Sequence, residues 1–193
     1  MTQLLISFIL FFSTTLLFGQ ELKYTIFWGD KNVGEITASK IKSGDLITYK
    51  IIADANIKVL LNYRIEYYTK CVYKDNKIFD SYANYELNDK IKEETTIKYT
   101  DGAYTCDNCK NFDLNITSIS FSICKLYFFE PVKPGKVFSE RFGEYIMVYK
   151  ESEHVYRLHL PNGNDNFYHY KNGELVKVSI DRALYSMDFV LKE

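Results

Sequence analysis

The chain has 193 residues, and its 24 Lys and Arg against 25 Asp and Glu give a net charge of −1. This balance gives no electrostatic reason to expect a nucleic acid or an anionic membrane as partner, so we predict no nucleic-acid binding. The 17 Tyr and 14 Phe against one Trp favour β-structure, and only 9 Gly and 3 Pro argue against a low-complexity chain.

The first twenty residues have the character of a secretory signal peptide. From Leu4 to Phe18 the chain is almost wholly apolar and contains no charged side chain, and it ends at Gly19 and Gln20. Such a run followed by a small residue predicts export, and it is short for a membrane-spanning helix. The usual basic start is missing, and Leu17 stands where a small residue is expected. We predict a signal peptide over residues 1–20 and export to the periplasm or beyond, with an uncleaved anchor as the alternative.

Strand signals dominate the first half of the single domain expected over residues 21–193. Alternating apolar and polar residues predict strands over 22–28, 33–41, 46–57 and 63–73, separated by turns rich in Gly, Asp and Asn. The clearest pattern is in the last of these, where every second side chain shares one face. That face holds Tyr63, Ile65, Tyr67, Thr69, Cys71 and Tyr73.

The next turn can be tested for strand register. A two-residue loop at Asp75 and Asn76 would place Tyr67 opposite Asn84, so apolar side chains would meet polar ones. A three-residue loop over 75–77 instead places Tyr73 opposite Phe79, and it aligns Ala83, Tyr85 and Leu87 with the apolar face. Because a slip of one residue turns every side chain to the other face, the pattern favours the longer loop.

The pattern changes after residue 112. Apolar residues at helical spacing predict a helix over 118–129, ended by Pro131. Strands are then expected over 144–150, 155–160, 167–170, 175–180 and 186–191. With a strand over 91–99, this makes about ten antiparallel strands in meander order. So many twisted strands tend to curl, so we predict a mainly β fold: one strongly curved sheet or incomplete barrel with one inserted helix.

Four cysteines, Cys71, Cys106, Cys109 and Cys124, are the disulfide candidates in an exported protein. One of the three pairings joins Cys106 to Cys109 and Cys71 to Cys124. Redox catalysis needs a thiol of low pKa, typically in a βαβ context that is absent here, and zinc sites usually have two C-x-x-C pairs or added histidines. We therefore interpret the cysteines as structural bridges or buried thiols, and we predict no catalytic residue, metal or cofactor.

The three histidines are His154, His159 and His169. Symmetric pairing across the turn over 161–166 would place His159 opposite Tyr168 and Leu158 opposite His169. Directly opposed residues share a face, so His159 and His169 would then point to opposite faces and could not hold one metal ion; a bulge would reverse this. Asn115-Ile116-Thr117 also matches a glycosylation motif, which has no meaning in a bacterial source.

Three segments of the chain resemble a known family: LKYTIFWGDKNVGEITASK over 22–40, LYFFEPVKPGKVFSERFGEY over 126–145, and NDNFYHYKNGELVKVSID over 164–181. The motifs that carry the likeness are Val33-Gly34-Glu35 and the segment over 138–143. The chain is similar to an uncharacterised, exported domain-of-unknown-function family common in Bacteroidetes. The resemblance implies a signal peptide and a β-rich fold, and no activity. The cysteines are not part of the family pattern.

Two classes of function follow from these observations. A curved sheet backed by a helix resembles periplasmic carriers that hold acyl chains on a concave face, which suggests a binding module for an apolar small molecule. The alternative is a structural or surface-interaction protein with a packed core, whose partner would be an envelope protein; a hydrolytic or redox enzyme is a weaker third reading. The predicted ligand-binding residues are the alternating aromatics Tyr63, Tyr67, Tyr73, Phe79 and Tyr85.

Overall fold

The computed structural model describes residues 18–58, 62–131, 133, 135–182 and 185–193. Most of the predicted signal peptide, residues 1–17, lies outside this range. Residues 18–20 form the start of the first strand, which pairs with the second strand from Phe18 onward. Cleavage after Gln20 would therefore remove the first three residues of that strand.

The described residues form a single antiparallel sheet of thirteen strands, with one helical turn. Neighbours in the sheet follow the order β7-β6-β5-β4-β3-β2-β1-β13-β12-β11-β10-β9-β8, so each half is a meander. The strands are β1 (Phe18–Trp28), β2 (Lys31–Ser43), β3 (Leu46–Lys58), β4 (Asn62–Lys74), β5 (Lys77–Leu87), β6 (Ile91–Thr100), β7 (Ala103–Asp107), β8 (Gly135–Ser139), β9 (Glu144–Ser152), β10 (Val155–His159), β11 (Asp165–Lys171), β12 (Glu174–Arg182) and β13 (Tyr185–Leu191), and the helix is α1 (Ile123–Leu126).

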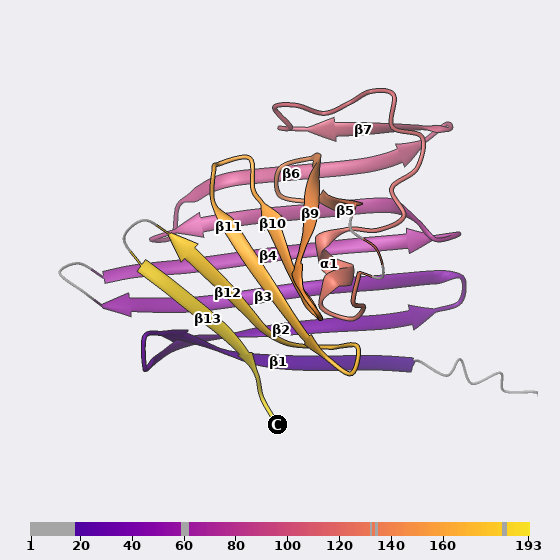
Figure 1. Cartoon of the computed structure of the whole chain (residues 1–193). Helices are drawn as coiled ribbons and strands as arrows, with labels where there is room; N and C mark the ends of the chain where they lie inside the picture. The colour runs from indigo at the N-terminus through magenta and orange to yellow at the C-terminus, as the bar shows by residue number, and fades with distance from the viewer. Residues whose placement is uncertain (1–17, 59–61, 132, 134, 183–184) are drawn as a thin grey trace, which may run out of the picture.

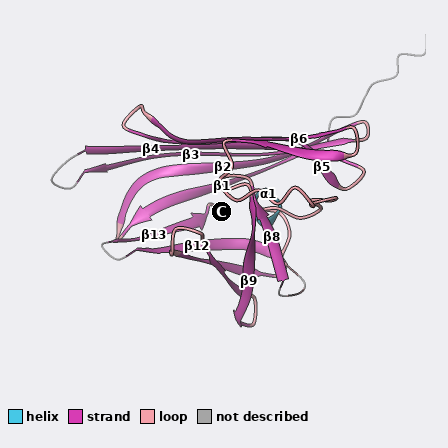
Figure 2. Ribbon diagram, turned by 90° about the horizontal axis from the view of Figure 1, so that it is seen from above, coloured by secondary structure: helices cyan, strands magenta, loops and turns pink. Residues whose placement is uncertain are grey.

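The sheet folds over itself into two layers, which are joined where the first and last strands meet. β1 pairs with β13 only between Tyr24 and Phe27, although it pairs with β2 along its whole length. The strands of the second layer cross those of the first at a steep angle, and α1 lies between the layers (Figures 1 and 2). The predicted mainly β fold with an open, strongly curved antiparallel sheet is confirmed. The two strands that the sequence pattern missed, β7 and β8, each have five residues.

The β4–β5 hairpin has the predicted register over most of its length, but its turn is shorter than predicted. Tyr67 pairs with Tyr85, as the three-residue loop required. The turn nevertheless has two residues, because Lys74 pairs with Lys77. A β-bulge next to Tyr73 shifts the register by one residue between turn and strand. Phe79 is the extra residue: Tyr73 pairs with Ile78 instead of Phe79, and the Phe79 side chain is 46% exposed.

The predicted helix over 118–129 is wrong for most of its length, since α1 comprises four residues. The preceding segment is extended and hydrogen-bonds to strands from both halves of the chain. The Ile78 N–H donates to the Ile119 carbonyl at 2.9 Å, and the Phe138 N–H donates to the Phe121 carbonyl at 3.1 Å. These bonds satisfy backbone groups at the ends of β5 and β8, which a longer helix would leave unpaired.

The two edge strands do not pair with each other among the described residues, yet the β8–β9 turn contacts the opposite edge of the sheet. Thr95 on β6 donates from its hydroxyl to the Arg141 carbonyl at 2.8 Å, and the Arg141 guanidinium forms an ion pair with Glu93. Gly143 has a φ of +68°, and a Cβ there would overlap the Cys109 side chain. Side-chain contacts at this turn thus bring the open edges together.

Candidate ligand-binding cavity

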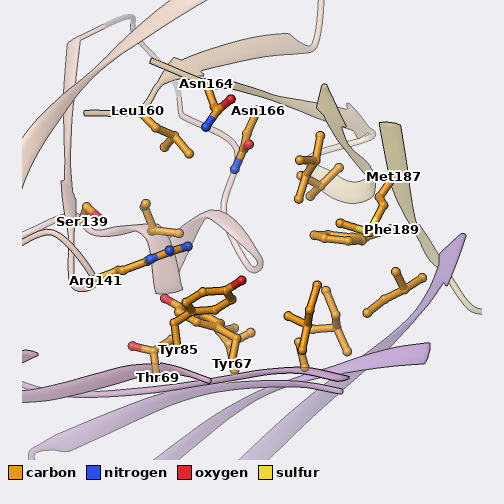
Figure 3. Close-up of a pocket in the computed structure, with 18 of the residues that line it drawn as sticks. Tyr67, Thr69, Tyr85, Ser139, Arg141, Leu160, Asn164, Asn166, Met187 and Phe189 are labelled. Atoms are coloured by element: carbon orange, nitrogen blue, oxygen red, sulfur yellow. The ribbon is translucent and has the colours of Figure 1, made fainter. Parts of the chain in front are cut away.

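A cavity of about 310 Å³ lies between the two layers. Its floor comes from the inward faces of β3, β4 and β5, and its opposite wall comes from β11, β12 and β13 (Figure 3). Most of the wall is aliphatic or aromatic. The described lining residues are Ile26, Ile36, Ile51, Ala53, Ala55, Ile65, Tyr67, Thr69, Tyr85, Ile123, Tyr127, Ser139, Arg141, Phe142, Leu160, Asn162, Asn164, Asn166, Tyr168, Val178, Ile180, Met187 and Phe189.

Two of the five predicted ligand-binding aromatics line this cavity. Tyr67 and Tyr85 are cross-strand partners on β4 and β5, and they stand side by side on its floor. Tyr63 lies near the outer end of β4, where it is 37% exposed, and Phe79 is turned outward by the bulge. The structure therefore does not bring Tyr63 and Phe79 into this site.

Tyr73 belongs to a packed region instead. Its side chain is 1% exposed, its hydroxyl donates to Ser122 Oγ at 2.8 Å, and its ring meets Tyr49 edge-on at 5.4 Å. Beside it, the Lys125 ammonium lies 3.8 Å from the centre of the Tyr73 ring, and burial lowers the Lys125 pKa to about 8. Tyr73 thus fixes α1 to the sheet.

A second hollow of about 940 Å³ is lined in part by Tyr73 and lies along α1 and the segment that follows it. Its walls mix aromatic rings with several charged side chains, including Lys40, Asp75 and Lys125. Lys40 lies over the Phe129 ring at 4.7 Å. Charged groups of both signs are typical of a solvated groove, so the cavity between the layers is the better candidate for an apolar ligand.

Polar groups gather at one side of the cavity. Arg141 extends from the β8–β9 turn, with its guanidinium 4.4 Å from the centre of the Tyr85 ring, and it is partly neutralised by Glu93. Asn164 and Asn166 lie across from it, near Leu160 (Figure 3). Sequence reasoning did not select these residues, because their side chains meet only when the β8–β9 turn faces the β10–β11 turn.

Tyr67 keeps a neutral hydroxyl at this site. Burial between the layers raises its pKa well above the usual value, and the nearby Glu140 carboxyl acts in the same direction. None of the described lining residues is a carboxylate, histidine or cysteine. The wall therefore offers shape, apolar surface and neutral hydrogen-bonding groups, which suit binding better than proton transfer.

The four cysteines form two separate pairs. Cys106 and Cys109 have adjoining sulfur atoms, and their Cα atoms are 5.8 Å apart, within the range of disulfides. Cys71 and Cys124 are free and fully buried beside Glu140. Burial raises the pKa of the Cys71 thiol to about 11 and that of Cys124 well above its usual value, so neither is a reactive thiolate at neutral pH. The Cys71, Cys124 and Glu140 side chains could jointly ligate a metal ion.

The predicted histidine arrangement is wrong. His159 pairs with Asp165 and His169 pairs with Val155, so the two histidines share a face instead of pointing to opposite faces. The reason is a shorter turn: the Leu160 N–H donates to the Asn164 carbonyl at 2.7 Å and closes the loop early. The histidines are still four residues apart along the pair of strands, roughly 13 Å, so they cannot share a metal ion.

Comparison with known proteins supports the fold and gives the family. Residues 24–192 match a domain of unknown function, DUF6134. The chain belongs to the DUF6134 family. No curated protein matches the sequence of this chain. None of the helices in the described residues is long and apolar enough to cross a bilayer.

The fold is similar to that of a solved structure. It is a β-barrel-like protein of the domain of unknown function DUF1849 from Brucella abortus, with a TM-score of 0.54 and 12% sequence identity. The match covers 93% of this chain and 98% of the other. At this identity the likeness shows the fold alone, and it supports the description of the curved DUF6134 sheet as barrel-like.

Proposed function

We propose that this protein is an exported binding or carrier module that holds an apolar ligand between its two layers. The observation that carries the proposal is the cavity of about 310 Å³ with a mainly aliphatic and aromatic wall. This volume is at the lower end of the range of small-molecule pockets, about 300–1,000 Å³. The ligand is therefore a slender apolar molecule, such as a single acyl chain.

The polar side of the cavity gives the ligand an orientation. The guanidinium of Arg141 and the amides of Asn164 and Asn166 lie on one side, while Ile180, Met187 and Phe189 lie elsewhere in the wall. A polar end group would lie near the first set, because a buried polar atom needs a hydrogen-bond partner. An amphipathic molecule with one polar end therefore fits better than a wholly apolar one.

Neighbouring positions on β3 supply a matched pair of variants. Ala53 lines the cavity, whereas Ile52 is on the opposite face of the same strand and is 40% exposed. Ala53→Phe would fill the space with an aromatic ring, and Ile52→Phe would add similar bulk outside. We expect A53F to weaken binding of a fluorescent fatty acid about tenfold or more, equivalent to about 1.4 kcal/mol of binding free energy, and I52F to leave it unchanged.

Native mass spectrometry of protein purified from its own cell envelope tests the same proposal without a chosen probe. The expected result is a polypeptide carrying one bound small molecule. Recovery of only the bare polypeptide mass, together with no uptake of fluorescent fatty acid, would contradict the proposal. The remaining function would then be that of a structural or surface-interaction protein, which the close packing around Tyr73 would support.

Export is the other part of the proposal, and it rests on residues 1–20 and the cysteine pair of the β7 segment. In an oxidising compartment the adjoining Cys106 and Cys109 would form a disulfide. Counting thiols after denaturation without reductant should then find two, from Cys71 and Cys124. Four reactive thiols would show that the bridge does not form.

A further inference from the structure

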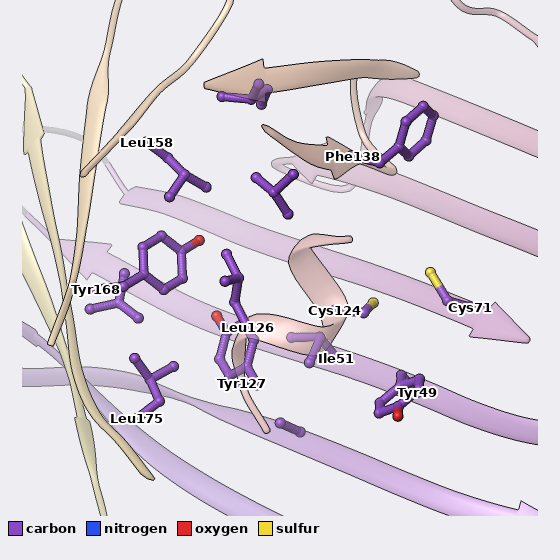
Figure 4. Close-up of a cluster of buried hydrophobic side chains, with 14 of the residues drawn as sticks. Tyr49, Ile51, Cys71, Cys124, Leu126, Tyr127, Phe138, Leu158, Tyr168 and Leu175 are labelled. Carbon is purple, nitrogen blue, oxygen red and sulfur yellow. The ribbon is translucent and has the colours of Figure 1, made fainter. Parts of the chain in front are cut away.

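Three potential metal ligands from distant parts of the chain meet in the core. Cys71 is on β4, Cys124 is in α1, and Glu140 follows β8 directly. The two cysteines are 0% exposed and Glu140 is 1% exposed. Their ligating atoms all lie within 4.8 Å of one another. Figure 4 shows the sulfur atoms of Cys71 and Cys124 between β4 and the helical turn.

The Glu140 carboxylate is only half satisfied by its surroundings. Its Oε1 accepts hydrogen bonds from the Cys124 N–H and from the Cys71 thiol, each at 3.0 Å. Its Oε2 is buried and has no hydrogen-bond partner among the described residues, where Glu140 also forms no ion pair. A buried carboxylate oxygen without a partner is unfavourable, so its presence in the core calls for a compensating group.

We propose that this cluster binds one Zn²⁺ ion through Cys71 Sγ, Cys124 Sγ and Glu140 Oε2. Zinc takes thiolate sulfur at about 2.3 Å and carboxylate oxygen at about 2.0–2.2 Å, so tetrahedral ligand atoms are roughly 3.3–3.8 Å apart. The present separations, which are at most 4.8 Å, need to contract by no more than about 1.5 Å. The two thiols release their protons to solvent on binding, and the ion becomes the partner of Glu140 Oε2.

Neighbouring hydroxyls are placed to support the thiolates. Ser81 Oγ lies 3.4 Å from Cys71 Sγ, and Thr69 Oγ1 lies 3.8 Å from Cys124 Sγ. Both residues are 1% exposed. Once the sulfur atoms lose their protons, these hydroxyls can donate to them, which is the usual role of groups behind metal ligands. The ion would then link β4, α1 and the β8–β9 turn, independently of any ligand in the cavity.

A disulfide between Cys71 and Cys124 would use the same sulfur atoms, but it does not account for Glu140. Both disulfide formation and metal binding remove the Cys71 proton that is donated to Oε1, but a disulfide would still leave Oε2 without a partner. The carboxylate therefore favours a cation over a bridge. Because the cluster is enclosed, we expect the ion to bind during folding and to leave slowly in the presence of a chelator.

The test is to refold the full chain from denaturant under reducing conditions with Zn²⁺ or Co²⁺ present. Native mass spectrometry should show one Zn²⁺ per chain, and Co²⁺ should give the near-ultraviolet charge-transfer absorption of a metal thiolate. Cys71→Ser, Cys124→Ser and Glu140→Gln should each abolish or strongly weaken binding. Ser81→Ala should weaken it about 10–100-fold, as expected when a group behind a ligand is removed. The matched control, Cys106→Ser with Cys109→Ser, should bind like the wild type.

One further readout, the melting temperature, keeps the outcome clear if a ligand variant fails to fold. Zn²⁺ should raise the melting temperature of the wild-type protein and of the Cys106/Cys109 control, because it binds the folded state. The proposal is overturned if refolded, reduced wild-type protein carries no metal and shows no thiolate absorption. It is also overturned if the signal requires Cys106 and Cys109, or if protein purified from the envelope contains a Cys71–Cys124 disulfide.

Discussion

The interior of this sheet has a packed end and a hollow end, and the same strands pass through both. Around α1, side chains such as Tyr73, Leu126 and Phe138 are almost fully buried and belong to one hydrophobic cluster. Figure 4 shows part of this cluster around the helical turn. Further along β3 and β4, Ala53 and Tyr67 face the cavity instead. The difference arises because α1 fills the space between the layers at one end only.

This contrast shows how one alternating strand can serve two purposes. On β4 the inward residues run from Ile65 and Tyr67 at the cavity to Cys71 and Tyr73 beneath α1. Inward and outward residues alternate along the whole of β4. Whether an inward residue faces the cavity or the packed core is therefore set by the element that lies opposite it. A segment with only one helical turn supports the packed end, and its contacts with Glu140 and Tyr170 hold it in place.

The largest expected difference between the two ends is in the free energy of unfolding that is lost when a leucine is replaced by alanine. Leu126 is 0% exposed in α1, and Leu160 is 5% exposed at the cavity wall. Leu126→Ala would open a new void in close packing and should reduce the free energy of unfolding by about 4 kcal/mol. Leu160 borders space that is already empty, so Leu160→Ala should reduce the free energy of unfolding by only about 2 kcal/mol. Urea denaturation of both variants measures this, and equal losses would mean that the two ends are packed alike.

Adding volume should also destabilise the packed end more than the cavity, with a smaller effect. Ala38 is 0% exposed in the core, and Ala53 lines the cavity. Ala38→Leu overfills the core and should destabilise the protein by about 2 kcal/mol. Ala53→Leu has room and should change stability by less than about 0.5 kcal/mol. Thermal unfolding of the two variants decides the matter; a large loss for A53L would show that the cavity is not available to a ligand.

Local patterns in the sequence were sufficient for the sheet but not for its irregularities. The period of two on β4 predicted that Tyr67 and Tyr85 would be opposed, and the structure pairs them. It could not predict that Phe79 would be the extra residue of a bulge, because the apolar match is equally good with a longer loop. The helical spacing over 118–129 was misleading for a related reason: Ile119 is fully buried in a non-helical segment, and its carbonyl accepts a hydrogen bond from β5.

The candidate sites depended on contacts that no local pattern contains. Glu140 is a charged residue in a polar stretch, and its burial follows from the meeting of β4, α1 and the β8–β9 turn. Arg141, the next residue, faces the cavity for the same reason. The cysteines could be named in advance, but their separation into a surface pair and a buried pair required the three-dimensional arrangement.

The smallest expected effect concerns a hydrogen bond at the packed end and its dependence on pH. Tyr170 on β11 donates from its buried hydroxyl to the Leu126 carbonyl at 2.8 Å. Tyr170→Phe should lower the free energy of unfolding by about 1 kcal/mol at pH 7, since the carbonyl loses its partner. Urea denaturation at pH 7 measures this difference.

The pH dependence follows from the state in which Tyr170 ionises. Burial raises its pKa in the folded protein above the ordinary value of 10.0, so above pH 10 the unfolded chain loses this proton first. The stabilising contribution of Tyr170 is therefore complete below pH 10 and declines as the pH rises further. Tyr170→Phe lacks this decline, so the difference in the free energy of unfolding between wild type and variant should become smaller between pH 10 and 11. A difference that stays constant would mean that the Tyr170 hydroxyl is open to solvent, and that the packed end is looser than its buried side chains indicate.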